Sequence, residues 1–200
     1  MSPPASTTTW RAFADIRDPA RTENTMTLRL VHPVHSNSDT RQALRREFEH
    51  VDPAVNRDDH APSVPDTLTY ITNVLSGHRR ATGTLASRVA IIITTSPALR
   101  DAMLPLLLND PDAGASLWTR FARQLRSSAR VEALTIAGCA YCLAGDNVRA
   151  AIACELAIAE AAEIDGRAPR LADLIVYTLD IAVDPKAAMR HAILASQSAT

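Results

Sequence analysis

Apolar side chains recur at intervals of three and four residues through most of the chain beyond residue 65, with polar side chains between them. The first such stretch carries Leu68, Ile71 and Leu75, which share one face of a helix predicted over residues 66 to about 78. The same spacing, with proline or glycine marking several of the helix ends, predicts further helices over residues 115–126, 129–144, 147–163, 169–182 and 185–195. We therefore expect residues 66–196 to form a helical domain.

One apolar run in this domain is open to two interpretations. Residues 89–95 read Val-Ala-Ile-Ile-Ile-Thr-Thr, and their β-branched content favours a buried strand. No second run of comparable strength is present to pair with it, and an isolated strand leaves its backbone groups without hydrogen bonds. We therefore predict a buried helix over residues 84–95. A further helix is predicted over residues 97–108, capped by Ser96 and bent or shortened by Pro105.

The N-terminal part of the chain has a different pattern. Residues 1–38 are rich in serine, threonine and proline and are predicted to form a flexible arm. Residues 39–65 are predicted to form a short helix over 40–51, behind the cap candidates Ser38 and Asp39, and then a loop with three prolines. The predicted fold class is all-α, a helical bundle or short helical-hairpin array with a mobile N-terminal arm.

Small residues are concentrated in the segment 131–164, which is about as long as one helical hairpin. The pattern resembles a single tetratricopeptide repeat, in which small residues let two antiparallel helices approach closely and a glycine turns the chain. Adjoining windows do not repeat it, which favours one repeat-like hairpin inside a bundle over a true array. The residues predicted to pack closely are Gly138, Tyr141, Gly145, Ala150 and Ala157.

A wider resemblance extends from residue 66 to about 194. It consists of an ordered series of short motifs: Arg100-Asp101-Ala102, Leu117-Trp118, Ala144-Gly145-Asp146, Leu171-Ala172-Asp173-Leu174 and Asp184-Pro185. In this order the chain resembles the carboxy-terminal half of the actinobacterial family catalogued as domain of unknown function 4192. The resemblance implies helical architecture, a cytoplasmic setting and no established activity. It also implies that the family's longer amino-terminal α/β portion is not represented.

Composition narrows the classes of partner. Lysine and arginine number 21 and aspartate and glutamate 22, so the net charge of -1 does not steer the chain towards nucleic acid or an anionic membrane. No apolar run reaches the roughly 18 residues of a bilayer-spanning helix, and the N-terminus has no signal-peptide pattern, so we expect a cytoplasmic protein without a membrane partner. Three cysteines in one apolar region fit reduced thiols better than a disulfide framework.

Candidate chemistry is sparse. Cys139 and Cys142 share a helix face near Cys154, but no fourth ligand for a structural metal site is apparent, and a buried-core role is favoured over metal or redox chemistry. Ligand-type residues at 32–35 and 58–60 lie in segments expected to be loose. The sequence shows no glycine-rich phosphate loop, nucleophile elbow or rigid carboxylate pair. We therefore assign no catalytic, cofactor-binding or metal-binding residues.

Arginines form the clearest charged pattern, and Arg120, Arg123, Arg126 and Arg130 are spaced as a stripe along and just beyond one helix. Such a basic patch could meet phosphates or an acidic partner, although a solvated face with the arginine stems lying over apolar surface is the favoured interpretation. Arg79 and Arg80 are interpreted only as a basic loop. The first functional hypothesis is a protein-protein interaction or scaffold module that binds another protein or peptide. The alternative is a nucleic-acid-binding accessory protein that uses the arginine stripe.

Overall fold

A computed structural model describes residues 38–51, 63–164 and 168–198. Every regular element in these ranges is helical, which confirms the all-α prediction. The predicted N-terminal arm, apart from residue 38, lies outside the described residues. The elements are α2 (Ser38–Arg46), α3 (Val64–Leu75), α4 (Gly83–Thr95), α5 (Pro97–Asp101), the 3-10 helix η2 (Leu104–Leu108), α6 (Pro111–Gln124), α7 (Ser127–Ala144), α8 (Asn147–Ile164), α9 (Arg170–Ile181) and α10 (Pro185–Ser198).

Short polar side chains and glycine define several helix ends. The Ser63 hydroxyl accepts the backbone N–H of Asp66 at the start of α3, and Ser96 likewise caps α5. Gly145 ends α7 with a φ of 88°, a left-handed conformation that favours glycine. Its neighbour Asp146 then accepts the backbone N–H of Arg149 at 3.0 Å, so one turn ends α7 and begins α8.

The ambiguous run at residues 89–95 is helical, as predicted, because it lies in α4. Val89, Ile92 and Ile93 are buried, and this spacing of three and four is that of a helix face and not of a strand. Residues 97–108, in contrast, form two short elements, α5 and η2, in place of one helix. Pro105 has no N–H to donate to the carbonyl four residues earlier, and its ring crowds that carbonyl, so the helix does not continue.

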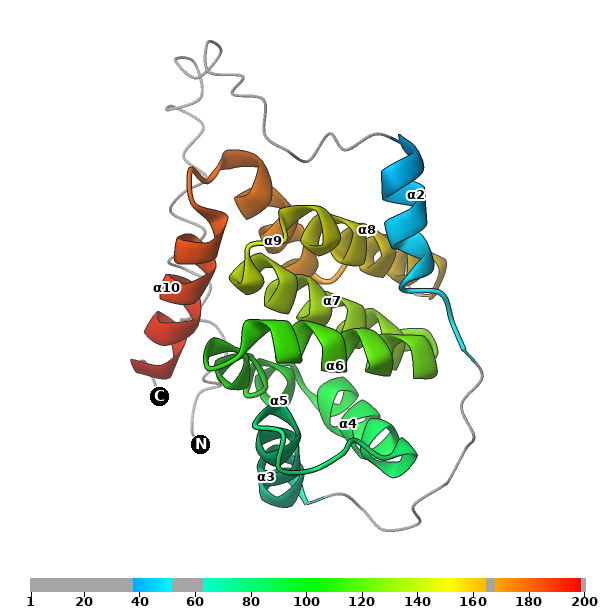
Figure 1. Ribbon diagram of the computed structural model, residues 1–200, viewed down its shortest axis with the longest axis vertical. Helices are drawn as coiled ribbons and strands as arrows, with labels where there is room; N and C mark the ends of the chain where they lie inside the picture. The colour runs from blue at the N-terminus through cyan, green and yellow to red at the C-terminus, as the bar shows by residue number, and fades with distance from the viewer. Residues whose placement is uncertain (1–37, 52–62, 165–167, 199–200) are drawn as a thin grey trace, which may run out of the picture.

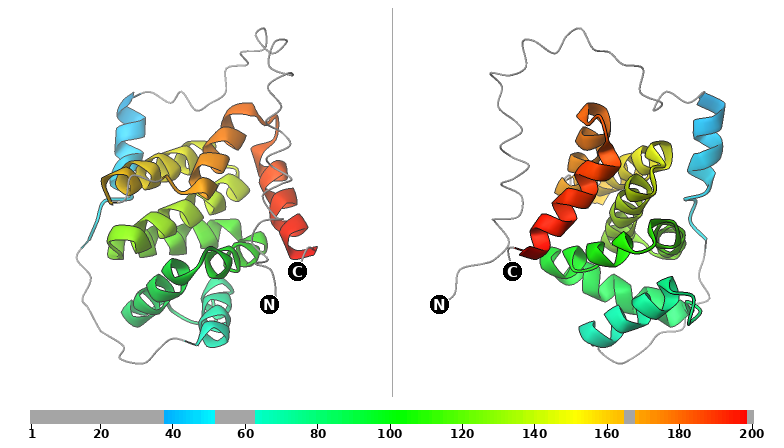
Figure 2. Two further views of the ribbon diagram at one scale, coloured as in Figure 1. Left: turned by 180° about the vertical axis from the view of Figure 1, so that it is seen from behind. Right: turned by 60° about the vertical axis from the view of Figure 1, so that its left-hand side comes forward.

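Helix α7 is the central element of the core. Figure 1 shows α6 and α8 on either side of it, with α3 and α4 beyond α6. Figure 2 shows α9 crossing the rear of α7 and α8, and α10 standing at one end of the bundle. The largest fully buried side chain is that of Trp118, whose ring meets Phe121 edge-on at 5.3 Å between centroids. Because helices surround α7, most of its circumference is buried.

The segment around α2 lies against α8 (Figures 1 and 2). Arg149 of α8 binds Glu47 through two nitrogen–oxygen contacts of 2.8 and 2.9 Å, and Arg41 of α2 pairs with Glu155. Phe48 is 0% exposed and meets the ring of Tyr141 edge-on. The helix was predicted over residues 40–51, but α2 ends at Arg46, and the following turn carries Phe48 into the core.

Candidate functional site

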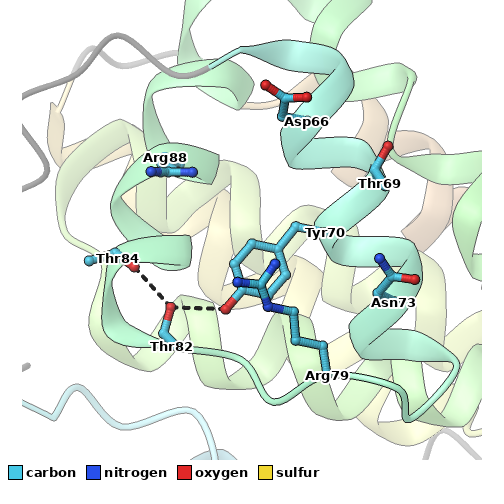
Figure 3. Close-up of a pocket in the computed structure, with 8 residues that line it drawn as sticks. All are labelled: Asp66, Thr69, Tyr70, Asn73, Arg79, Thr82, Thr84 and Arg88. Atoms are coloured by element: carbon cyan, nitrogen blue, oxygen red, sulfur yellow. Dashed lines mark hydrogen bonds between the residues drawn. The ribbon is translucent and has the colours of Figure 1, made fainter.

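A polar cleft lies between α3 and α4, beside the loop that joins them (Figure 3). Its volume is about 420 Å³, which falls in the usual range for ligand sites. Both helices and the loop contribute to its walls. The lining residues are Asp66, Thr69, Tyr70, Asn73, Arg79, Thr82, Thr84 and Arg88.

The four lining residues of α3 share one face of that helix. Asp66, Thr69, Tyr70 and Asn73 follow each other at intervals of three, one and three, which places them within two turns on the same side. The neighbouring face, which carries Ile71, is buried in the core. The amphipathic pattern that folds α3 onto the bundle therefore also orients its polar side chains towards the cleft.

The opposite wall is formed by the first turns of α4. Thr84 and Arg88 are four residues apart and lie above one another on the helix, while Leu85 and Val89 face the core. Thr82 is the N-cap residue of α4, but its hydroxyl makes no capping hydrogen bond. That hydroxyl instead lies 2.9 Å from the Thr84 hydroxyl, at the edge of the cleft (Figure 3).

Tyr70 is the fixed centre of the cleft. Its side chain is only 8% exposed, and its hydroxyl donates to the carbonyl of Arg80 at 3.2 Å. The same hydroxyl lies 3.2 Å from the hydroxyl of Thr82, which joins the Tyr70 ring to the start of α4. The ring is thereby held both by burial and by two hydrogen bonds, and its orientation is set before any ligand arrives.

Arg79 lies over one face of that ring. Its guanidinium carbon is 3.8 Å from the ring centroid, a cation–π contact that draws the side chain over the cleft (Figure 3). Within the described residues the guanidinium forms no ion pair and no hydrogen bond, and the carboxylate of Asp66 forms none either. The cleft thus presents a positioned cation whose N–H groups have no acceptor in the described chain.

The lining residues of the cleft carry a positive net charge. Two arginines, Arg79 and Arg88, line it, against one acidic residue, Asp66. Hydroxyl and amide groups supply most of the remaining polar surface, and these can donate or accept hydrogen bonds. An arrangement of this kind can bind an anionic or strongly polar group, but it contains no nucleophile paired with a base.

The predicted arginine stripe divides into an exposed part and a buried part. Arg120, Arg123 and Arg126 are exposed, and Arg123 also donates to the carbonyl of Glu49 at 3.3 Å. Arg130 is only 9% exposed, so its inclusion in a surface patch was wrong. The reason is the break between α6 and α7, where Ser127 adopts a φ of 51° and the chain changes direction.

Arg130 instead joins three parts of the fold. Its Nε lies 2.8 and 2.9 Å from the two carboxylate oxygens of Glu160 on α8. Its terminal nitrogens donate to the carbonyl of Ala122, near the end of α6, and to the carbonyl of Phe48, at 2.9 Å for the latter. Burial of this charge is compensated by a carboxylate and two carbonyls, so Arg130 is a structural residue.

Of the predicted close-packing residues, Gly138 and Ala150 meet between α7 and α8, whereas Tyr141 faces α6 and Phe48. A β-carbon placed on Gly138 would overlap the sulfur of Cys154 and would lie 3.3 Å from the carbonyl oxygen of Ala150. Ala157 is fully buried, Gly145 forms the turn, and the hydroxyl of Tyr141 lies 3.1 Å from that of Thr119. Because neighbouring helices cover most of this hairpin, it forms the core of the fold. A hollow of about 210 Å³ lies at its open end, where Val131 of α7 and Ala161 of α8 meet Pro169.

The three cysteines are free and buried. Burial raises the pKa of the Cys142 thiol to about 12, and it raises the pKa of Cys139 and Cys154 as well. A thiol that stays protonated near neutral pH is a poor nucleophile and a poor metal ligand. No group of three histidine, cysteine, aspartate or glutamate side chains is arranged to hold a metal in the described ranges, and the ligand-type residues at 32–35 and 58–60 lie outside them.

Sequence reasoning missed the cleft. Arg79 was assigned only to a basic loop, and Tyr70 only to a helix, because their stacking depends on how the loop folds back over α3. One signal was available. The polar residues Asp66, Thr69 and Asn73 follow the same helical period as the apolar ones and mark a second, polar face of the helix.

The family model described as "Domain of unknown function (DUF4192)" matches residues 3–180. The match covers most of the chain, and the chain therefore belongs to this family. The match begins well before residue 66, where the series of short motifs starts, and ends before α10. No curated protein and no solved structure matches the chain. Within the described residues, none of the helices has both the length and the apolarity to cross a membrane.

Proposed function

We propose that this member of the DUF4192 family is a protein-protein interaction or scaffold module, and that its partner protein or peptide binds in the cleft between α3 and α4. One observation carries the proposal. Arg79 is held over the ring of Tyr70 at the mouth of a cleft of about 420 Å³, and its guanidinium has no ion-pair partner in the described chain. Arginine and tyrosine are residue types enriched where proteins bind each other tightly.

The rest of the fold supports this location. The α7–α8 hairpin, on which the interaction hypothesis first rested, is enclosed by α6, α9 and the α2 segment. The α3–α4 pair lies at the edge of the bundle, where one face packs on the core and the other is open (Figure 1). A rigid frame with an exposed, pre-oriented anchor loses little conformational entropy on binding.

The proposal is tested with the full chain as immobilised bait in a lysate of the native cell. Bound proteins are quantified for the parent, for Arg79→Ala in the cleft and for Arg120→Ala on α6. Arg120 is also an exposed arginine but lies outside the cleft, so it is a matched control. We expect at least one partner that the parent and Arg120→Ala retain and that Arg79→Ala loses. Partners retained equally by all three baits would place the interaction surface elsewhere.

Nucleic-acid binding is the second candidate, and Arg120, Arg123 and Arg126 are the observation that favours it. Three exposed arginines along the end of α6 can contact at most about three phosphates, which corresponds to a shallow dependence of affinity on salt. Retention on duplex DNA that weakens as salt rises, with this shallow slope, and that is lost when these three arginines are replaced by glutamine would support this function over the first.

Finer assignments belong to the same proposal. The α7–α8 pair is proposed to be a tetratricopeptide-like hairpin, because small residues bring its helices close together. The chain is proposed to correspond to the carboxy-terminal half of an actinobacterial protein family, on the order of its short motifs. A cytoplasmic location is proposed because the three buried cysteines are unpaired.

A further inference from the structure

The α3–α4 cleft has a charge opposite in sign to that of the whole chain. The chain carries a net charge of -1, whereas the cleft is lined by two arginines and one aspartate. We infer that the cleft recognises an acidic segment of the partner protein, with an aspartate or glutamate carboxylate bound by Arg79. This inference rests on the proposed function and names the chemistry of the partner at the same site.

Arg79 is suited to a carboxylate because its position is already set. The cation–π contact at 3.8 Å occupies one face of the guanidinium, and its N–H groups lack an acceptor within the described ranges. A guanidinium presents paired N–H donors that match the two oxygens of a carboxylate, and such charge-assisted bonds are stronger than neutral ones. The carboxylate therefore gains a pre-oriented partner at little entropic cost.

The remaining walls fit the backbone around that carboxylate. The Asn73 amide can donate and accept hydrogen bonds, and the hydroxyls of Thr69 and Thr84 can do the same. A peptide carries backbone N–H and C=O groups at every residue, so it can use donors and acceptors distributed over both walls. Asp66 lies at the far end of the cleft from Arg79 (Figure 3), where it can accept a hydrogen bond from a peptide N–H.

The surface beside the cleft points to a peptide and not to a small anion. Ile91 lies on α4 three residues beyond Arg88 and seven beyond Thr84, which places it on the same face of the helix. Its side chain is 51% exposed, one of the large apolar side chains that the fold leaves uncovered. A peptide with an apolar residue close to its acidic residue would contact Arg88 and Ile91 together, whereas a free phosphate or carboxylate would not.

The test uses two synthetic pools of octapeptides with random flanking positions, identical except that the central pair is Glu-Glu in one and Gln-Gln in the other. The full chain is immobilised at near-physiological salt, and the retained peptide is quantified for the parent, for Arg79→Gln and for Arg120→Gln. We expect the parent to retain several times more of the Glu-Glu pool than of the Gln-Gln pool. Arg79→Gln should abolish the difference, and Arg120→Gln should preserve it.

Each other outcome overturns the inference. Equal retention of the two pools by the parent would show that the cleft does not select carboxylates. A preference that survives Arg79→Gln would show that the carboxylate is not bound by Arg79. Loss of the preference on adding millimolar inorganic phosphate, together with equal affinity for free glutamate, would assign a small-anion site. Arg79-dependent retention of an oligothymidine in place of the acidic peptides would assign nucleic acid. Thermal unfolding of each variant shows whether the fold is intact, which is expected because Arg79 is exposed.

The two experiments distinguish failure of the proposed interaction function from failure of the inference about an acidic segment. If the lysate experiment finds a partner that depends on Arg79 but the pools are not discriminated, the interaction module stands and the acidic segment does not. If no partner depends on Arg79 and the pools are not discriminated, both fail.

Discussion

Gly138 of α7 faces Cys154 of α8 so closely that a β-carbon on Gly138 would overlap the Cys154 sulfur. The same β-carbon would lie 3.3 Å from the carbonyl oxygen of Ala150, which is backbone and cannot move aside easily. The two helices therefore approach at a point where only glycine fits. This contact sets the spacing of the central hairpin, on which α6 and α9 also pack.

Replacing Gly138 by alanine is expected to destabilise the fold by about 1–3 kcal/mol, the usual cost of overpacking a core. Alanine has a higher helix propensity than glycine by roughly 1 kcal/mol, so the two effects oppose each other. Gly138→Leu should cost more, since leucine places further atoms against α8. Urea unfolding measures the change. The same substitution in a Cys154→Ala background should cost less, because the sulfur is gone, and an unchanged cost there would show that Cys154 is not the obstacle.

Phe48 is expected to contribute more to the stability of the α2 segment than the surface ion pairs do. Phe48→Ala removes a side chain that is 0% exposed and should cost about 3–5 kcal/mol. Glu47→Gln removes a pair between partly exposed groups and should cost at most about 1 kcal/mol. Amide exchange should become faster across α2 in Phe48→Ala and stay near the parent rate in Glu47→Gln. The reverse ranking would mean that the Glu47–Arg149 pair holds the segment.

Arg130→Met is expected to be strongly destabilising, by about 3–5 kcal/mol, although methionine fills much of the same volume. The substitution leaves Glu160 without its buried counter-charge and leaves the carbonyls of Ala122 and Phe48 without their donor. Arg120→Met, at an exposed position on α6, should change the free energy of unfolding by less than about 0.5 kcal/mol. An equally small change in the free energy of unfolding for both variants would show that Arg130 behaves as an exposed residue of the basic patch.

Cys142 is expected to make stability depend on alkaline pH. Its pKa is raised to about 12 in the folded protein, while an unfolded cysteine titrates near pH 8.5. The folded state therefore holds the thiol proton more tightly, and this contribution is complete below about pH 8.5 and is lost as the pH rises towards 12. Between pH 7.5 and pH 10, the parent should lose about 2 kcal/mol more than Cys142→Ala in urea unfolding. Parallel losses would show that this thiol ionises normally.

Much of the helical fold followed from the sequence, for local reasons. The period of three and four residues identified α3 and α6 to α10, and the absence of a pairing strand identified α4 correctly despite its β-branched residues. Pro105 indicated that the helix over 97–108 would bend or shorten, and in the structure α5 ends at Asp101, four residues before this proline. Gly138 and Gly145 were recognisable because small residues and a turn glycine have few other uses inside a helical hairpin.

The candidate site did not follow in the same way. The spacing of Arg120, Arg123, Arg126 and Arg130 suggested one continuous stripe, but the chain turns at Ser127 and the last arginine enters the core. Arg79 has no local pattern at all, because its contact with Tyr70 arises when the loop folds back over α3. Exposure of a long charged side chain is decided by the elements packed around it and not by its neighbours in sequence.

The sequence by itself determined where most of the long helices lie and which side of each is apolar, because both depend on the helical period and on backbone chemistry within a few residues. It also determined that Gly138 sits at a close approach. Only the tertiary structure decided which faces meet. The burial of Arg130 requires Ala122, Phe48 and Glu160 from three different segments to converge on one guanidinium. The cleft likewise exists because packing on the core brings the polar faces of α3 and α4 together. Such convergence depends on long-range contacts that no local period encodes.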